Sequence, residues 1–94
     1  MPLVESGYLY TDDLGCAVGS PAWAAWLISH TSFYYTSPAG TFTARKELRS
    51  GGGWYWYGYR KHAGQLHKCY LGMSHQLTTP RMADVAQRLA EKAV

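Results

Sequence analysis

The chain has 94 residues and a formal net charge of +3, which is enough for one small domain but not for a large enzyme with a deep pocket. Four Trp and eight Tyr are many for this length, whereas no apolar run approaches the ~18 residues that a membrane span requires. We therefore expect a single soluble domain over residues 1–94, located in the cytoplasm, with no membrane partner and with reduced cysteines.

The first third of the chain, residues 1–31, predicts a small hairpin followed by a short helix. Two short apolar segments surround an Asp-Asp-Leu-Gly turn, which favours a hairpin over residues 8–18. Ser20, followed by Pro, then suits a helix start, because Ser accepts hydrogen bonds from first-turn amides and Pro has no N–H to leave unpaired. We expect this helix over about residues 21–29. Its apolar face is spaced by three and four residues: Trp23, Trp26 and Leu27.

Residues 32–72 change to period-two alternation and to β-favouring residues, which predicts an antiparallel sheet. Pro38 and Gly40 suit a tight turn between the first two strands, and His62-Ala63-Gly64 suits another between the last two. The result would be a meander of three to four strands. The expected strands cover residues 32–36, 41–48, 54–61 and 65–72.

The last segment predicts a helix over residues 78–93, because a Thr-Thr-Pro start precedes a regular apolar stripe. Such a stripe would cover one face of the sheet while the charged residues point elsewhere. The predicted fold class is therefore α+β, with a three- to four-stranded antiparallel meander sheet packed by a C-terminal helix and a short N-terminal helix beside it. The stripe consists of Met82, Val85, Ala86, Leu89 and Ala93.

Charge is distributed unevenly along the chain. Residues 1–44 contain three acidic residues and no Lys or Arg, whereas residues 45–68 contain six of the nine Lys and Arg residues and one Glu. This asymmetry suggests that one surface meets an anion, and nucleic acid is the commonest partner of that kind. The alternative is that water-facing strand and turn residues must be polar and happen to be basic here.

Strand alternation divides the segment 54–61 into two faces. Because Arg60 and Lys68 favour solvent, we expect them on the outer face, with Trp54, Trp56, Leu66 and Tyr70 beside them. Such a patch needs an explanation: either the N-terminal helix covers the indoles, or the face is open and presents rings and cations to a partner. The residues then expected under the C-terminal helix are Tyr55, Tyr57, Tyr59, Cys69 and Leu71.

Several segments carry a resemblance to a known family. "WAAWL", "SFYY", "GTFTARKE", "WYWYGYRK", "YLG" and "VAQRLA" resemble, in the same order, a segment at the amino end of large bacterial LuxR-type regulators with a MalT-like ATPase. Similar segments also occur as short separate proteins, and the likeness covers nearly the whole chain from Trp23 onward. It implies a bacterial protein of transcription regulation, alone or within a larger regulator. The chain has no Gly-rich Lys-Ser/Thr loop, so ATP-dependent activation is not implied.

The order of strands and helix also looks like the arm-type DNA-binding domain of tyrosine integrases. In that fold a three-stranded sheet lies in the major groove and the helix packs behind it. The resemblance implies DNA-facing side chains at Arg45 on the first strand, Trp56 and Arg60 on the second, and Lys68 on the third. The catalytic tyrosine and arginines of the recombinases have no identified counterpart here, so strand cleavage is not implied.

Metal and enzyme chemistry find little support in the residue pattern. His62, His67, Cys69 and His75 are of types that bind zinc, but their spacing matches no closed four-ligand finger. A Cys69 nucleophile would need a pocket and an orienting partner, and no suitable pair of carboxylates suggests a hydrolase. We therefore expect no metal, no cofactor and no enzymatic activity.

The sequence thus predicts a small nucleic-acid-binding domain, DNA being the first candidate, with a regulatory or accessory role. Most of the cations would contact phosphates, Arg60 and Lys68 would read base edges, and Trp54 or Trp56 would stack on a base. The alternative is a protein-interaction or homodimerisation module, with the same Trp-rich face as its hot spot. The residues expected to contact nucleic acid are Arg45, Arg49, Trp54, Trp56, Arg60, Lys61, His62 and Lys68.

Overall fold

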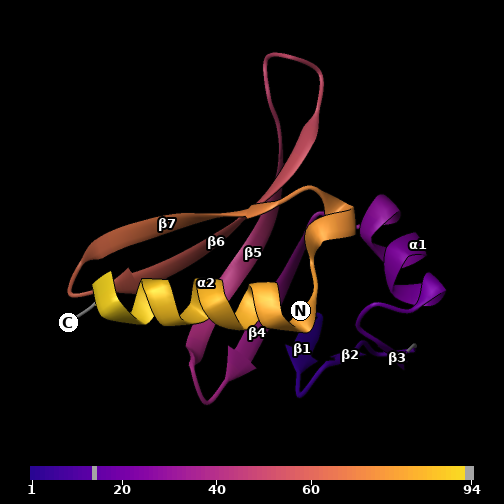
Figure 1. Ribbon diagram of the computed structural model, residues 1–94, viewed down its shortest axis with the longest axis horizontal. Helices are drawn as coiled ribbons and strands as arrows, with labels where there is room; N and C mark the ends of the chain where they lie inside the picture. Colours follow the sequence, from indigo (N-terminus) through magenta and orange to yellow (C-terminus); the bar gives the residue numbers. More distant parts are fainter. Residues whose placement is uncertain (14, 93–94) are drawn as a thin grey trace.

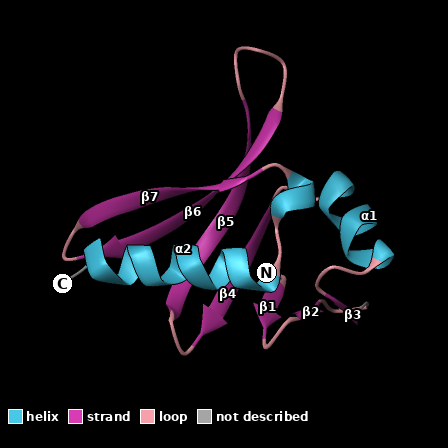
Figure 2. Ribbon diagram, in the orientation of Figure 1, coloured by secondary structure: helices cyan, strands magenta, loops and turns pink. Residues whose placement is uncertain are grey.

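The computed structural model describes residues 1–13 and 15–92, which form a seven-stranded sheet, two α-helices and one 3-10 turn (Figures 1 and 2). The strand order is β3-β2-β1-β4-β5-β6-β7. Neighbouring strands are antiparallel except β1 and β4, which are parallel. The elements are β1 (Leu3–Glu5), β2 (Tyr8–Tyr10), β3 (Gly15–Ala17), α1 (Pro21–Ser29), β4 (Ser32–Ser37), β5 (Gly40–Leu48), β6 (Trp54–His62), β7 (Gln65–Gly72), η1 (Ser74–Gln76) and α2 (Thr79–Lys92).

The α+β class is confirmed, whereas the number of strands and the purely antiparallel arrangement were wrong. Strands β4 to β7 form the expected meander, and β2 and β3 pair as the hairpin expected within residues 8–18. Position 14, in the expected turn of that hairpin, lies outside the described residues. The additional strand is β1, whose three residues are too few to show a period-two pattern. Its parallel pairing with β4 joins segments far apart in the chain, which local sequence does not reveal.

Helix α1 has the bounds predicted from its capping residues. Ser20 Oγ accepts a hydrogen bond from the Trp23 amide at 3.2 Å, and Pro21 occupies the first helical position. At the other end, His30 Nδ1 lies 2.9 Å from the Trp26 carbonyl oxygen, and Lys46 Nζ donates to the Leu27 carbonyl at 2.7 Å. Cationic donors are favourable at these unpaired carbonyls. The ammonium group of Lys46 therefore caps the C-terminal end of α1.

Helix α2 crosses the sheet on one side, in front of the central strands in Figure 1. Its first turn is capped by Thr78, whose Oγ1 accepts from the Arg81 amide at 3.3 Å. The Arg81 guanidinium donates to the carbonyls of Leu71 and Tyr70, each at 3.0 Å, and so fastens the helix to β7. The stripe residues Met82, Val85, Ala86 and Leu89 are buried. The expected end at residue 93, with the stripe residue Ala93, lies outside the described residues.

Both helices pack on the same face of the sheet, and the core lies between them and that face. The rings of Trp23 and Trp26 in α1 lie 5.6 and 6.2 Å from Phe33 in β4, and Phe33 lies 5.3 Å from Trp56 in β6. In the described part of the chain, neither helix packs on the opposite face. The sheet residues of the core are Val4, Leu9, Cys16, Phe33, Tyr35, Phe42, Ala44, Trp56 and Leu71.

The expected facing of β6 was wrong, and Gly58 gives the physical reason. A Cβ at Gly58 would lie 3.1 Å from Val85 Cγ1 of α2, so this glycine allows the helix to approach the strand closely. Trp56 and Arg60 share its face by alternation, and Trp56 is 0% exposed. Arg60 remains on the helix side because it lies toward the end of β6, where its guanidinium approaches Gly40.

Candidate nucleic-acid interface

The face of the sheet opposite the helices is built by direct cross-strand pairs that run over β5, β6 and β7. Arg45 pairs with Tyr57, which pairs with Tyr70, and Thr43 pairs with Tyr59, which pairs with Lys68. Paired residues in a sheet point to the same side. We call this surface the open face. Its members on these strands are Thr43, Arg45, Glu47, Tyr55, Tyr57, Tyr59, Lys61, Leu66, Lys68 and Tyr70.

Rings and cations are already in contact on the open face. Lys68 Nζ lies 4.2 Å from the centre of the Tyr57 ring and 5.5 Å from that of Tyr59. The guanidinium of Arg49, just beyond the end of β5, lies 5.2 Å from the Tyr57 ring. Because these cations and Tyr70 cover it, Tyr57 is only 8% exposed. Tyr57 therefore supports the cations, and other rings are available to stack on a partner.

Glu47 is the one carboxylate in the middle of this cationic group. It accepts a hydrogen bond from the Tyr59 hydroxyl, and its Oε1 lies 3.2 Å from Lys68 Nζ. The hydrogen bond from Tyr59 is the main cause that lowers the pKa of Glu47. The same network raises the pKa of Lys68, mainly through Tyr59, while burial and then Glu47 raise the pKa of Tyr59. We call these three residues the triad: Glu47 is held as a carboxylate, Tyr59 as a phenol and Lys68 as an ammonium.

The triad predicts a pH dependence that a Glu47→Gln variant should lack. The folded pKa of Glu47 lies below its ordinary value of 4.5, so its contribution to stability is fully present above that pH. The contribution is lost as the pH falls through the folded pKa. The difference in unfolding free energy between the native chain and Glu47→Gln should therefore shrink between pH 6 and pH 3. Urea denaturation across that range measures it, and a constant difference would contradict the triad.

The expected contact residues are divided between the two faces. Arg45, Arg49 and Lys68 gather around Tyr57, and Lys61 lies on the same open face opposite Leu66. The other four do not belong to it. Trp56 is in the core, Arg60 is on the helix side, His62 is exposed at the end of β6 with the same facing as Arg60, and Trp54 lies beside α1. The expectations that Trp56 stacks on a base and that Arg60 reads base edges from the open face were wrong.

Trp54 borders a separate apolar groove on the helix side. The groove measures about 650 Å³ and is lined by residues of α1, β6 and the turn after β7. Trp54 is 49% exposed, and Ile28 and Met73 are also exposed at this groove. Lys46 Nζ lies 5.7 Å from the Trp54 ring and 5.6 Å from that of Trp56. Trp54 therefore belongs to a different surface from Arg45 and Lys68.

The sequence argument placed the tyrosines on the wrong side. Of the eight tyrosines, Tyr35 alone lies in the buried cluster, whereas Tyr55, Tyr57 and Tyr59 were expected under α2. Two signals could have corrected this. A glycine inside a strong strand indicates close approach of another backbone, so Gly58 marks the helix side. Once Lys68 is taken as solvent-facing, the tyrosine directly opposite it must face solvent as well.

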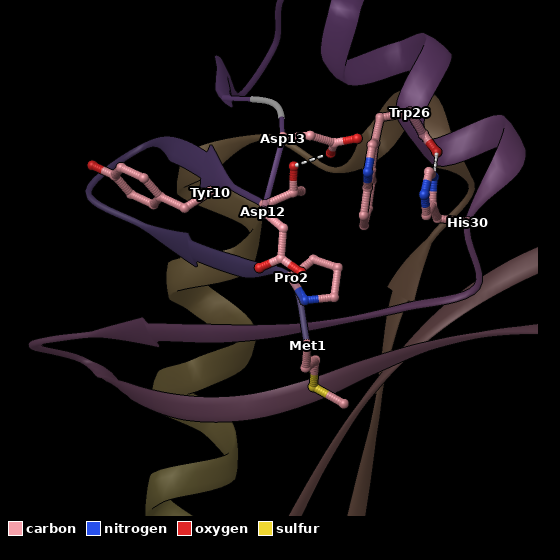
Figure 3. A pocket seen from close by; sticks show the side chains of 8 residues that line it. Met1, Pro2, Tyr10, Asp12, Asp13, Trp26 and His30 are labelled. Carbon is pink, nitrogen blue, oxygen red and sulfur yellow. Dashed lines mark hydrogen bonds between the residues drawn. The ribbon is translucent and has the colours of Figure 1, made fainter.

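A second hollow, of about 680 Å³, lies between the N-terminal segment and the C-terminal end of α1. Figure 3 shows Asp12 and Asp13 between Pro2 and Trp26, with His30 hydrogen-bonded to the Trp26 carbonyl. Thr11 Oγ1 donates to Asp13 Oδ1 at 3.4 Å. Across residues 1–13 and 15–92, no group of three His, Cys, Asp or Glu side chains is placed to hold a metal ion. Tyr10 also lines this hollow, and because its described lining residues include two Asp and no Lys or Arg, the hollow is not a site for phosphate.

Comparison with known proteins returned no relative: no family model, no curated protein and no solved structure matches this chain. In the part of the chain that the structure describes, no helix is both long and apolar enough to cross a membrane. Support for a function must therefore come from the chain's own residues, and the open face offers the strongest chemistry.

Proposed function

We propose that the protein binds nucleic acid with its open face, as a small regulatory or accessory domain. The observation that supports this most directly is the gathering of Arg45, Arg49, Lys61 and Lys68 among tyrosine rings on the uncovered face of the sheet. Cations provide affinity for phosphates, and rings accept the faces of bases. The resemblance to LuxR-type regulators makes DNA the first candidate.

The contact residues take roles according to their exposure. Arg45, Arg49 and Lys61 are exposed, and among the described residues none of them forms an ion pair with a carboxylate, so they are the phosphate ligands. Lys68 is partly neutralised by Glu47, and it positions the rings of Tyr57 and Tyr59. A positioned ring costs less conformational entropy on binding than a mobile one.

Salt dependence provides the first test of this proposal. Three exposed cations neutralising about three phosphates should give a slope of log K against log salt of roughly −2 to −3. Fluorescence anisotropy with a labelled random-sequence oligonucleotide, titrated at salt concentrations from about 30 to 300 mM, measures it. Binding that does not change with salt would contradict phosphate contacts on the open face.

A homodimer is the second candidate function, favoured by the exposed apolar side chains around the groove of Trp54, Ile28 and Met73. Aromatic residues in such grooves are typical anchors of protein interfaces. A second copy seated there would raise the molecular mass with protein concentration in sedimentation experiments. It would also leave the open face accessible, since the groove lies on the helix side.

A further inference from the structure

We infer that the open face takes a single strand of nucleic acid rather than a duplex, and that the strand continues across the sheet onto tyrosines of β4 and β2. This rests on the proposed function and specifies its ligand. The additional contact residues are Tyr34 and Tyr10, which were not among the contact residues expected from the sequence. Single-stranded DNA and single-stranded RNA share the chemistry that these residues recognise, namely unpaired bases and a flexible anionic backbone.

A row of tyrosines runs across the sheet at right angles to its strands. Tyr10 pairs with Leu3, Leu3 with Tyr34, Tyr34 with Thr43, and Thr43 with Tyr59. All of them point to the open face, so a ring stands on every second strand, at intervals of roughly 9.6 Å. Tyr34 is 38% exposed and Tyr10 is 49% exposed.

The open face is too wide to enter a duplex groove as a whole, so a duplex could not contact the complete row of tyrosines. Seven strands give six spacings, and six spacings of about 4.8 Å make a surface roughly 29 Å wide. The major groove of B-DNA is only ~12 Å wide and admits a helix or a two-stranded ribbon. A surface of this width can instead support an extended strand lying along it.

The spacing of the rings also favours unpaired bases. Bases of one strand in a duplex follow each other at ~3.4 Å and stack on their neighbours, so their faces are not accessible to side chains. Rings that stand roughly 9.6 Å apart can be used only by bases that leave their neighbours. A single strand allows this at low cost, because every base has a free face and the backbone is flexible.

Charge divides the row into two parts. The cations Arg45, Lys61 and Lys68 lie on β5 to β7, whereas the β1 and β2 end has Glu5 on the same face and no Lys or Arg among its described residues. Phosphates are therefore held at one end, and the other end contributes stacking alone. Tyr34 and Tyr10 should thus contribute affinity that does not vary with salt.

The test compares ligands of equal length at about 50 mM salt. Labelled 20-nucleotide single strands of DNA and of RNA, and the matched DNA duplex, are titrated with the whole chain by anisotropy. We expect at least one single strand to bind ten or more times as tightly as the duplex.

The DNA and RNA arms show which strand is preferred, and preference for either supports the inference. Duplex binding equal to or tighter than both single strands would overturn it while leaving nucleic-acid binding intact. Failure of all three to bind would remove the proposed function itself.

Variants of the row provide the second arm of the test. Tyr34→Ala should weaken single-strand binding about fivefold or more with the salt slope unchanged, because a stacked base is lost. Tyr34→Phe retains the ring and should bind like the native chain. Tyr10→Ala, on another strand, repeats the measurement if Tyr34→Ala does not fold. Thr36→Ala, on the same face of β4, is the matched control. Unchanged binding by both alanine variants of tyrosine would overturn the extended path.

Discussion

Replacement of Trp56 by alanine should lower the free energy of unfolding by about 3–5 kcal/mol, as expected for a large buried aromatic residue. Its indole is 0% exposed, contacts Phe33, and donates a hydrogen bond from Nε1 to Ser74 Oγ at 2.9 Å. The variant would leave a large cavity under α1 and α2 and remove the partner of Ser74. Urea denaturation followed by circular dichroism measures the change.

Trp54→Ala is the matched control for this prediction. The two residues are of the same type, lie two positions apart on β6 and share a face, but Trp54 is 49% exposed. Its replacement should lower the free energy of unfolding by no more than about 1 kcal/mol. Equal losses in the two variants would contradict the packing of β6 described here. A greater loss in Trp54→Ala would do so even more strongly.

Local signals in the sequence predicted most of the fold. Ser20 before a proline and Thr78 before Thr79-Pro80 set the starts of both helices, because capping depends on a few neighbouring residues. The strands of the meander followed from their alternation and turns. Strand β1 did not, since its three residues are ordered by a distant partner in β4. Non-local pairing of this kind leaves no period in the segment itself.

The candidate site was only half predictable, because charge and packing gave opposite indications for β6. The charge of Arg60 favoured solvent for the face of β6 that carries Trp56, Gly58 and Arg60. The missing side chain of Gly58 favoured packing of that same face against a helix. Packing determines the outcome in the middle of a strand, where α2 lies within contact distance, and a long Arg side chain can reach solvent from the end. Lys68 was correctly placed on the solvent side by its charge, whereas Trp56 was not.

Removal of two cations from the open face should weaken nucleic-acid binding by about fiftyfold or more at 50 mM salt, since each lost phosphate contact costs roughly tenfold there. The double variant Arg45→Gln/Lys61→Gln removes charges that lie on adjacent strands of that face. The salt slope should fall by about 1.4–1.8 at the same time, because two fewer counterions are released. Anisotropy titrations at several salt concentrations give both quantities.

The double variant Arg60→Gln/Arg88→Gln removes the same charge from the helix side. Arg60 shares the face of Gly58, and Arg88 lies on α2, where it forms an ion pair with Asp84 at 3.0 Å. Both are separated from the open face by the sheet or the helix, and screening over roughly 14 Å at 50 mM salt limits their effect to less than about threefold. If the two double variants lost affinity equally, binding would follow the net charge of +3 rather than a site. A loss confined to Arg45→Gln/Lys61→Gln would place the phosphates on the strands where the cations meet the tyrosine rings.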